Sequence, residues 1–176
     1  VQAVSGQTNA EISVLTQKAQ EFSVSYKMGI DEVTDGLATL GRAGLGSLDT
    51  QLETLQSGFQ LAKVEGMQLN DALEQIVQTT SLMGGNLNSV SFGKDTQDMT
   101  DMLLATSMSG PLDVNDVVQT LQYSGGTAAA GGINLENKDA LYDYLGAISA
   151  FAQKGVVGSM AGTAMRAFFT KPASQD

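Results

Sequence analysis

The side chains best able to do chemistry in this sequence are carboxylates. The 176 residues include 19 acidic residues but no histidine and no cysteine. Asp95, Asp98 and Asp101 recur at every third position, so on a helix they would share one face and could hold a calcium ion. They lack the oxygen-rich loop and central glycine of an EF-hand. Capping and solvation account for most of the other carboxylates, which fall at predicted helix starts or on polar faces.

The composition excludes several classes of function. Without histidine the chain lacks the commonest general base and metal ligand, and without cysteine it has no disulfide or thiolate metal site. Two carboxylates could still serve a glycosidase, but we predict that the chain is not an enzyme and has no catalytic residue, cofactor or metal site. The net charge of −10 argues against nucleic-acid binding. The longest uncharged apolar run, residues 155–165, is well short of the ~20 residues of a membrane helix, so we predict no membrane segment.

Apolar residues at helical spacing, separated by glycines and capping residues, predict an all-α fold. We expect a compact bundle or array of about seven to eight short helices joined by Gly-rich turns, forming a single helical domain over residues 1–176. The expected helix starts are a capping box at residues 8–11, then Asp31, Ser47 or Asp49, Asn70, Asp95 or Thr96, Asp113, Asn134 or Asn137, and Ser159. Both chain ends look like cuts, so we expect a piece of a longer protein.

Glycines occur in the predicted helical pattern both as pairs expected to break helices and as single residues inside helices. Gly84-Gly85, Gly125-Gly126 and Gly131-Gly132 are expected to interrupt helices. The last two pairs could suggest a phosphate cradle, but no strand precedes them and no Lys-Ser/Thr follows, so we predict a flexible turn. Five other glycines fall inside helical patterns: Gly36, Gly41, Gly58, Gly146 and Gly162. We expect close helix packing at Gly41 and Gly162, and the alternative is a fold kept loose enough to rearrange.

The stretch 152–169 concentrates small residues. Gly155 lies where a helix C-terminal glycine belongs, and Ser159 is predicted to cap the last helix. Another backbone can approach closely at the small residues Gly158, Ala161, Gly162 and Ala164. Arg166 is the only charge between residues 155 and 170, so we expect it to pair with a carboxylate or with carbonyls at a helix end.

Residues 155–166 read Gly-Val-Val-Gly-Ser-Met-Ala-Gly-Thr-Ala-Met-Arg. This run resembles the Gly-(Ile/Val)-x-Gly-Ser-x-Ala-Gly-Thr-Ala-x-Arg signature of phage tail tape measure proteins, a family also called the phage minor tail protein core region. The structural motif positions are Gly155, Gly158, Ser159, Ala161, Gly162, Thr163 and Arg166. Residues 33–45 and 116–123 resemble earlier segments of the family, so the resemblance runs from about residue 5 to residue 169. Residues 85–95 depart from it by being more polar.

The resemblance implies a structural role. A tape measure protein spans the lumen of the virion tail, sets tail length as a ruler for tube assembly, and is ejected before DNA passes. The implied partners are tail tube and tail-tip proteins, tail assembly chaperones and further copies of the chain. The implied locations are the tail lumen and, during assembly, the host cytoplasm.

Two alternatives stay open from the sequence. Eight methionines, several at helical spacing around residues 99–102, could line the contact surface of a helical protein-binding or adaptor module. The second alternative is a lytic enzyme that acts on the cell wall. Lytic domains occur in this family, but they would lie elsewhere on a longer chain.

Overall fold

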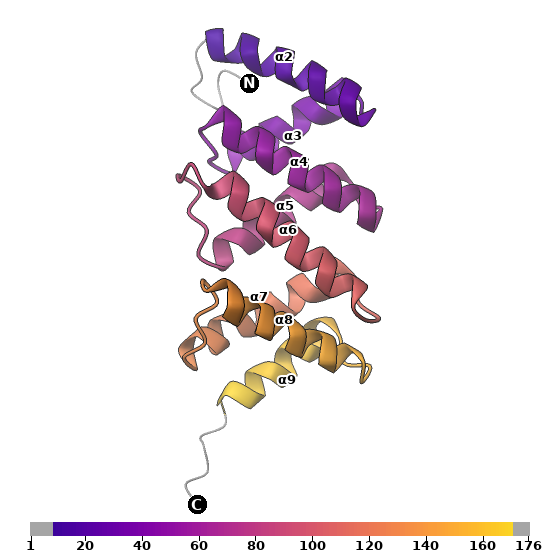
Figure 1. Cartoon of the computed structure of the whole chain (residues 1–176), viewed down its shortest axis with the longest axis vertical. Coiled ribbons are helices and arrows are strands. Elements are labelled where there is room, and N and C mark those ends of the chain that lie inside the picture. Colours follow the sequence, from indigo (N-terminus) through magenta and orange to yellow (C-terminus); the bar gives the residue numbers. More distant parts are fainter. Residues whose placement is uncertain (1–8, 171–176) are drawn as a thin grey trace, which may run out of the picture. The chain divides into compact units, whose positions relative to one another are not determined.

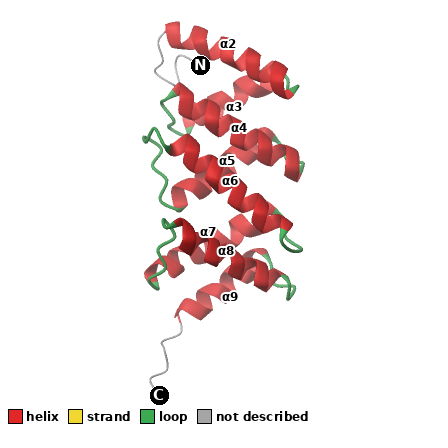
Figure 2. Ribbon diagram, viewed as in Figure 1, coloured by secondary structure: helices red, strands yellow, loops and turns green. Residues whose placement is uncertain are grey.

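The structure, a computed structural model, describes residues 9–170, and these form α-helices and no strand (Figures 1 and 2). The helices are α2 (Asn9–Tyr26), α3 (Ile30–Arg42), α4 (Leu48–Glu65), α5 (Leu69–Leu82), α6 (Phe92–Met108), α7 (Val114–Ala130), α8 (Lys138–Ala152) and α9 (Gly158–Thr170). The predicted all-α fold is therefore confirmed. The described chain divides into two compact units, which we call unit 1 (residues 9–81 and 85–100) and unit 2 (residues 82–84 and 101–170).

Unit 1 has a leucine-rich core. Its helices α2, α3 and α4 pack in succession, and each contributes residues that recur every three or four positions, as an amphipathic helix requires. The buried cluster comprises Leu15, Ala19, Val33, Leu37, Leu40, Leu45, Leu55, Leu69, Leu73 and Phe92. The aromatic rings of Phe22, Tyr26 and Phe59 gather beside it, with centroids of Tyr26 and Phe59 4.7 Å apart.

Unit 2 is built on α7, α8 and α9. The buried residues of α7 include Val114, Val117, Val118, Leu121 and Ala128, and those of α8 include Leu141, Tyr144, Leu145 and Ile148. The starts of α7 and α8 follow the predicted capping chemistry. The Asp113 carboxylate accepts a hydrogen bond from the Asp116 N–H at 2.7 Å, and the Asn137 side chain accepts from the N–H groups of residues 139 and 140.

Other predicted caps were wrong. Asp31, Asn70 and Asp95 lie inside the first turns of α3, α5 and α6 instead of capping them. The first helical residue of α6 is Phe92, which is fully buried in the core of unit 1. Packing therefore extends these helices toward their N-termini, where carboxylates in the first turn still interact favourably with the helix dipole. The capping box expected at residues 8–11 lies outside the residues whose side chains the structure describes.

Helix α7 continues through the expected break at Gly125-Gly126, so that prediction was also wrong. Gly125 faces Met83 and Leu135, and a Cβ there would lie 3.4 Å from the Met83 Cε. The helix then runs through Ala128, Ala129 and Ala130, which have the highest helix propensity. It ends at Gly131, and Gly132 follows with a φ of 93°. Only the second of these two glycine pairs forms a turn.

Candidate functional site

The candidate site is the contact between α9, which carries most of the predicted motif, and α7. Gly155 precedes α9 and closes α8 with a φ of 77°. Its N–H donates to the Ala152 carbonyl oxygen at 2.8 Å, and the next N–H, of Val156, donates to the Phe151 carbonyl oxygen at 3.1 Å. This pair of bonds is the Schellman arrangement. The prediction of a helix C-terminal glycine is confirmed here.

Gly162 allows α9 to lie directly on the backbone of α7, and Gly158 leaves room for the Asp116 and Gln119 side chains of α7. A Cβ at Gly162 would lie 2.5 Å from the Tyr123 Cβ and 3.2 Å from the Thr120 carbonyl oxygen. Gly158 begins α9 with a φ of 57°, and a Cβ there would lie 2.9 Å from the Asp116 Oδ1. Ala161 and Met165 complete the buried side of α9. The predicted close approach of another backbone is confirmed at Gly162.

Hydrogen bonds fix the register of this contact. The Thr120 hydroxyl lies 2.8 Å from the Asp116 carbonyl oxygen in its own helix and 2.9 Å from the Gly158 carbonyl oxygen across the interface. Its single proton is shared between the two acceptors. Because Thr120 is fully buried, loss of the hydroxyl would leave the Gly158 carbonyl without this donor.

Tyr144 ties α8 into the same cluster. Its hydroxyl donates to the Ser124 hydroxyl, which donates to the Thr120 carbonyl oxygen at 2.6 Å. The ring of Tyr144 stacks on Phe169 of α9, with centroids 6.0 Å apart. Burial raises the pKa of Tyr144 above its usual 10.0, while the hydrogen bond with Ser124 acts in the opposite direction. Tyr144 thus connects α7, α8 and α9.

The remaining motif residues face away from α7. Ser159 and Thr163 are exposed, and the Thr163 hydroxyl donates to the Ser159 carbonyl oxygen at 2.8 Å. The prediction that Ser159 caps α9 was wrong, because the helix already starts at Gly158. Arg166 is exposed, and within residues 9–170 its guanidinium forms no ion pair. The expected partner of Arg166 is therefore not found in the described part of the chain.

The glycines inside helices are of two kinds. Gly36 and Gly58 face leucine side chains, and a Cβ at Gly36 would lie 2.9 Å from the Leu55 Cδ1. A Cβ at Gly146, by contrast, would have no neighbouring atom within 4 Å. Gly41 is half-buried in α3, and its close packing stays a prediction. Packing explains Gly36, Gly58 and Gly162, and the structure gives no packing reason for Gly146.

The described residues do not assemble the other chemical sites that the sequence raised. They include no cluster of three acidic residues able to hold a metal ion. Asp98 pairs with Lys94 at 3.8 Å, and Asp95 accepts a hydrogen bond from the Ser91 hydroxyl. Met99 and Met102 are buried in α6, so they do not line an open groove. None of the helices in residues 9–170 is long and apolar enough to cross a membrane.

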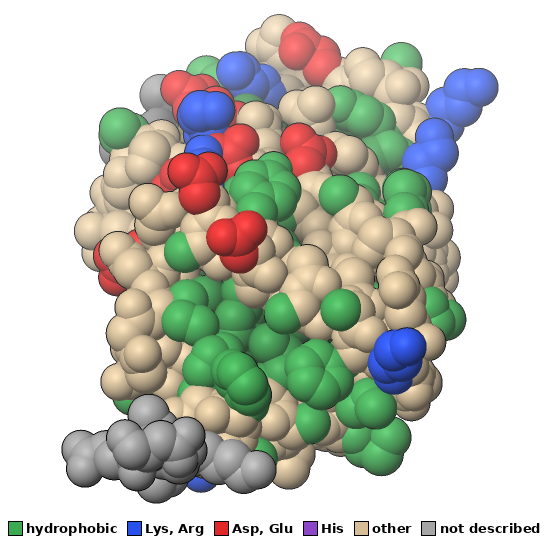
Figure 3. All heavy atoms as spheres, turned by 60° about the horizontal axis from the view of Figure 1, so that its bottom comes forward, with side chains coloured by type: hydrophobic (Ala, Val, Ile, Leu, Met, Phe, Trp, Pro, Cys, Tyr) green, Lys and Arg blue, Asp and Glu red, His purple; other side chains and the backbone are tan. Residues whose placement is uncertain are grey.

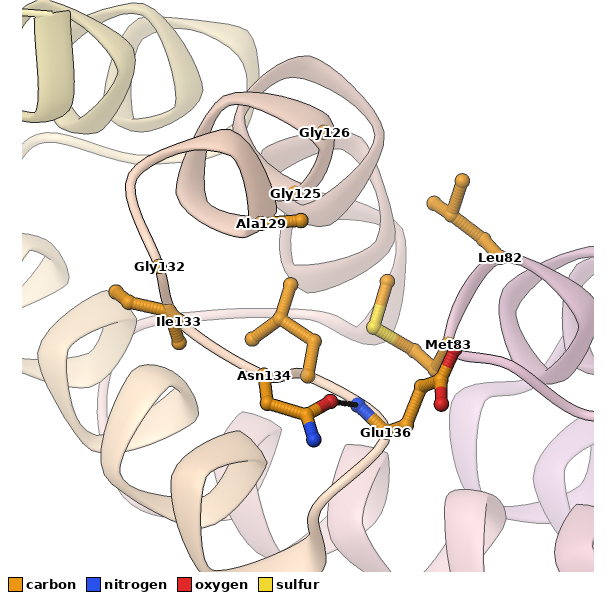
Figure 4. Close-up of a pocket in the computed structure, with 10 residues that line it drawn as sticks. Leu82, Met83, Gly125, Gly126, Ala129, Gly132, Ile133, Asn134 and Glu136 are labelled. Carbon is orange, nitrogen blue, oxygen red and sulfur yellow. Dashed lines mark hydrogen bonds between the residues drawn. The ribbon is translucent and has the colours of Figure 1, made fainter.

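A cavity of about 350 Å³ in unit 2 is one place where a small ligand could bind (Figure 4). Met83, Gly125, Ala129 and Ile133 give it mainly apolar walls. Figure 4 shows the Asn134 side chain turned toward the Glu136 N–H, which donates to its Oδ1 at 3.1 Å. That amide stabilises its own turn and does not converge on the cavity with other polar groups, as a specific ligand site requires.

Comparisons with known proteins identify the family of the chain. Residues 16–176 match the model of the phage-related minor tail protein family. The chain belongs to this family. It is also 22% identical over 166 residues to the tape measure protein of Pneumococcus phage Dp-1, an alignment that covers 94% of the chain and 13% of that protein. No solved structure matches the chain. As a member of the minor tail family it is a phage tail component, in a family of structural proteins that are generally non-enzymatic.

The sequence analysis missed the hydroxyl-bearing residues of this contact, which lie on α7 and α8. Thr120 and Ser124 are four residues apart on a helix whose neighbours Val117 and Leu121 are buried. That spacing places both hydroxyls on the apolar side, which was the available signal. No sequence pattern connected them to Tyr144 or to Gly158.

Proposed function

We propose that this segment acts within a tape measure protein, which lies in the tail lumen, sets tail length, and leaves before DNA passes. The membership in the minor tail family and the similarity to a tape measure protein support the proposal. To act as a ruler inside a narrow tube, the protein must change from packed helices to helices arranged end to end in an extended row. The contacts between helices must therefore be separable while the helices persist.

The observation that carries the proposal is how the buried hydroxyl groups are bonded. Most buried threonine and serine hydroxyls with a bond in the structure donate to a carbonyl oxygen in their own helix. The donor and acceptor pairs are Ser57 and Glu53, Thr96 and Gly93, Thr100 and Thr96, Thr106 and Met102, Ser107 and Leu104, and Ser124 and Thr120. Such bonds are kept when the helices separate, so opening does not strand these groups.

The cost of opening is then mainly apolar. When unit 1 opens, the leucines of its core become exposed to water. The free-energy cost is roughly 25 cal/mol for each Å² of apolar surface exposed. Contacts with a tail tube or with chaperones can offset that loss, because binding partners that prefer the open state shift the equilibrium toward it. The chain has 19 acidic and nine basic residues. Its negative charge repels DNA, which suits a protein that occupies a channel through which DNA later passes.

Tail tube and tail-tip proteins, assembly chaperones and further copies of the chain are the partners that this role requires. The methionine-lined adaptor surface loses its main support, since Met83, Met99, Met102 and Met165 are buried. We therefore do not carry the adaptor function forward.

The test is to change the length of the ruler. Residues 30–66 contain α3 and α4, and as extended helix they span roughly 55 Å at 1.5 Å per residue. Deleting them from the intact gene should shorten the tail by about that length, measured by electron microscopy. Replacing them with an unrelated helical sequence of equal length is the matched control and should restore the tail. Tails of unchanged length in the deletion variant would contradict the ruler role.

A further inference from the structure

Four buried oxygen atoms toward the C-terminal end of α5 have no hydrogen-bond partner among residues 9–170. They are the Oε1 of Gln75 and the hydroxyl oxygens of Thr79, Thr80 and Ser81. Thr79 is 1% exposed and Thr80 is 2% exposed. Each of these groups loses its bonds to water on folding and gains none in return, which lowers the stability of the folded state at this position. Exposure of this part of α5 to water removes that cost.

The buried hydroxyls of α6 and α7 behave differently. Those of Thr100 and Ser124, for example, donate to carbonyl oxygens of their own helices, at 2.8 and 2.6 Å. Exposure of these two residues exchanges one hydrogen bond for another, so water offers them little. The hydroxyls of Thr79 and Thr80 gain a bond where they had none. The end of α5 is therefore a place where opening is favoured by the polar groups themselves.

Met83 follows directly after α5 and borders the cavity of about 350 Å³ in unit 2 (Figure 4). A Cβ added at Gly125 would lie 3.4 Å from the Met83 Cε and 3.6 Å from the Leu135 Cδ1. Met83 is 7% exposed, but the side of it that faces the cavity has no packed neighbour. A side chain beside a cavity makes fewer dispersion contacts than one packed on all sides. An unbranched methionine can also leave such a position by rotation about its own bonds.

The backbone after Met83 can change direction. Gly84 has a φ of 93° and is followed by a second glycine, Gly85. The Gly85 N–H donates to the Thr80 carbonyl oxygen at 2.8 Å, a bond that closes the last turn of α5. Phe92, the first residue of α6, is fully buried in the core of unit 1. The two glycines can absorb a movement of the end of α5 without displacing Phe92.

We propose that residues 79–84 form a latch, which opens while the rest of the fold of the isolated chain persists. In the closed state, which the structure shows, Met83 lies against Gly125 and Leu135. In the open state the last turn of α5 unwinds, the hydroxyls of residues 79–81 bond to water, and Met83 leaves the cavity wall. Opening therefore uncovers the apolar walls of the cavity. The latch is a property of the isolated chain and goes beyond the proposed function, which concerns the assembled tail.

Oxidation by hydrogen peroxide tests the latch, because a buried methionine sulfur reacts when local opening exposes it. Met102 of α6 is the matched buried methionine, at 3% exposed, and Met160 of α9 is the open reference, at 60% exposed. Figure 3, which brings the α9 end of Figure 1 forward, shows hydrophobic side chains gathered on that surface. Initial oxidation rates from peptide mass spectrometry should place Met83 between the two, at least about tenfold above Met102.

Threonine variants test the cause of the opening. Thr79→Val combined with Thr80→Val keeps the shape of both side chains and removes the hydroxyls that gain bonds to water. Oxidation of Met83 should then slow roughly tenfold, while that of Met102 stays unchanged. Thr100→Val is the matched control, since that hydroxyl is bonded within its own helix, and it should leave the Met83 rate unchanged.

Two results would overturn the proposal. The first is a wild-type chain in which Met83 is oxidised as slowly as Met102, and this comparison needs no variant. The second is an unchanged Met83 rate in the double valine variant when its far-UV circular dichroism matches that of wild type. Neither result bears on length setting, which the gene deletion tests separately.

Discussion

In unit 1 the helices meet through leucine side chains, whereas in unit 2 α9 meets α7 backbone to backbone. At Gly36 in unit 1 the neighbouring atoms are the ends of Leu55, Leu69 and Leu73 side chains. At Gly162 the neighbours are the Tyr123 Cβ and the backbone of Thr120. A leucine can change rotamer to admit a methyl group, but a backbone cannot move without moving its helix.

The hydrogen bonds differ in the same sense. In unit 1 the hydroxyls of Ser57 and Thr100 donate within their own helices, and the Thr96 hydroxyl is closer to the Gly93 carbonyl oxygen of its own helix, at 2.6 Å, than to the Thr54 hydroxyl, at 3.4 Å. In unit 2 the Thr120 and Tyr144 hydroxyls bond at short range to another helix. Bonds between helices in unit 1 include the exposed one from Thr39 to Asn70, at 3.2 Å, and the long one from Thr96 to Thr54. Unit 1 therefore opens mainly with loss of apolar contact, while unit 2 must also break short, buried bonds between helices. The register of α9 on α7 is therefore fixed by hydrogen bonds as well as by packing.

The largest expected effect is at Gly162. Gly162→Ala places a methyl group against the α7 backbone, so we expect a loss of about 2–3 kcal/mol in the free energy of unfolding. The urea midpoint followed by circular dichroism measures it. Gly36→Ala is the matched variant in unit 1 and should cost about 1 kcal/mol or less. Equal losses at the two glycines would remove the distinction between the units.

A smaller effect is expected at Thr120. Thr120→Val keeps the shape and removes the hydroxyl that serves the Gly158 carbonyl, so it should cost about 1–2 kcal/mol. Thr100 is also fully buried, but its hydroxyl donates to the Thr96 carbonyl oxygen of its own helix at 2.8 Å. Thr100→Val should therefore change stability by less than about 0.5 kcal/mol. An equal loss of unfolding free energy in both variants would show that the hydrogen bond from Thr120 to Gly158 contributes no more to stability than a bond within one helix.

The smallest change, with the opposite sign, is expected at Gly146. No atom lies within 4 Å of the position of an added Cβ, so Gly146→Ala should stabilise α8 by up to about 1 kcal/mol through helix propensity. A rise in the thermal midpoint measures it. A destabilised Gly146→Ala variant would indicate a contact that the structure does not contain.

The sequence predicts helix number and helix interiors better than helix ends. Leucine and valine spacing locates the core helices, because burial requires one apolar side. Helix starts such as Phe92 depend on tertiary packing, which overrides local capping preference. The helix break predicted at Gly125 was wrong for the same reason. In the sequence, a glycine that makes room for a neighbouring side chain such as Met83 cannot be distinguished from a glycine that ends a helix. The close packing at Gly162 was predictable from residue size, but its partners Thr120 and Tyr144 lie on other helices and carry no local pattern.

The central claim is that the helices separate in the tail while they remain helical. The hydroxyl oxygens of Ser109 and Ser149 lie 2.7 Å apart although the residues are 40 positions apart in sequence. The chain has no cysteine, so Ser109→Cys with Ser149→Cys gives one pair placed closely enough for a disulfide to form. In an extended helical row the same positions are roughly 60 Å apart.

The measurement is disulfide formation on oxidation, first in the isolated chain and then in assembled phage tails. Ser89→Cys with Ser91→Cys is the control pair, since those hydroxyls are 2.8 Å apart and only two residues apart in sequence, and it should cross-link in both settings. If the helices separate in the tail, the 109–149 disulfide forms in the isolated chain and not in the tail. Its formation in assembled tails as completely as in the isolated chain would contradict that separation.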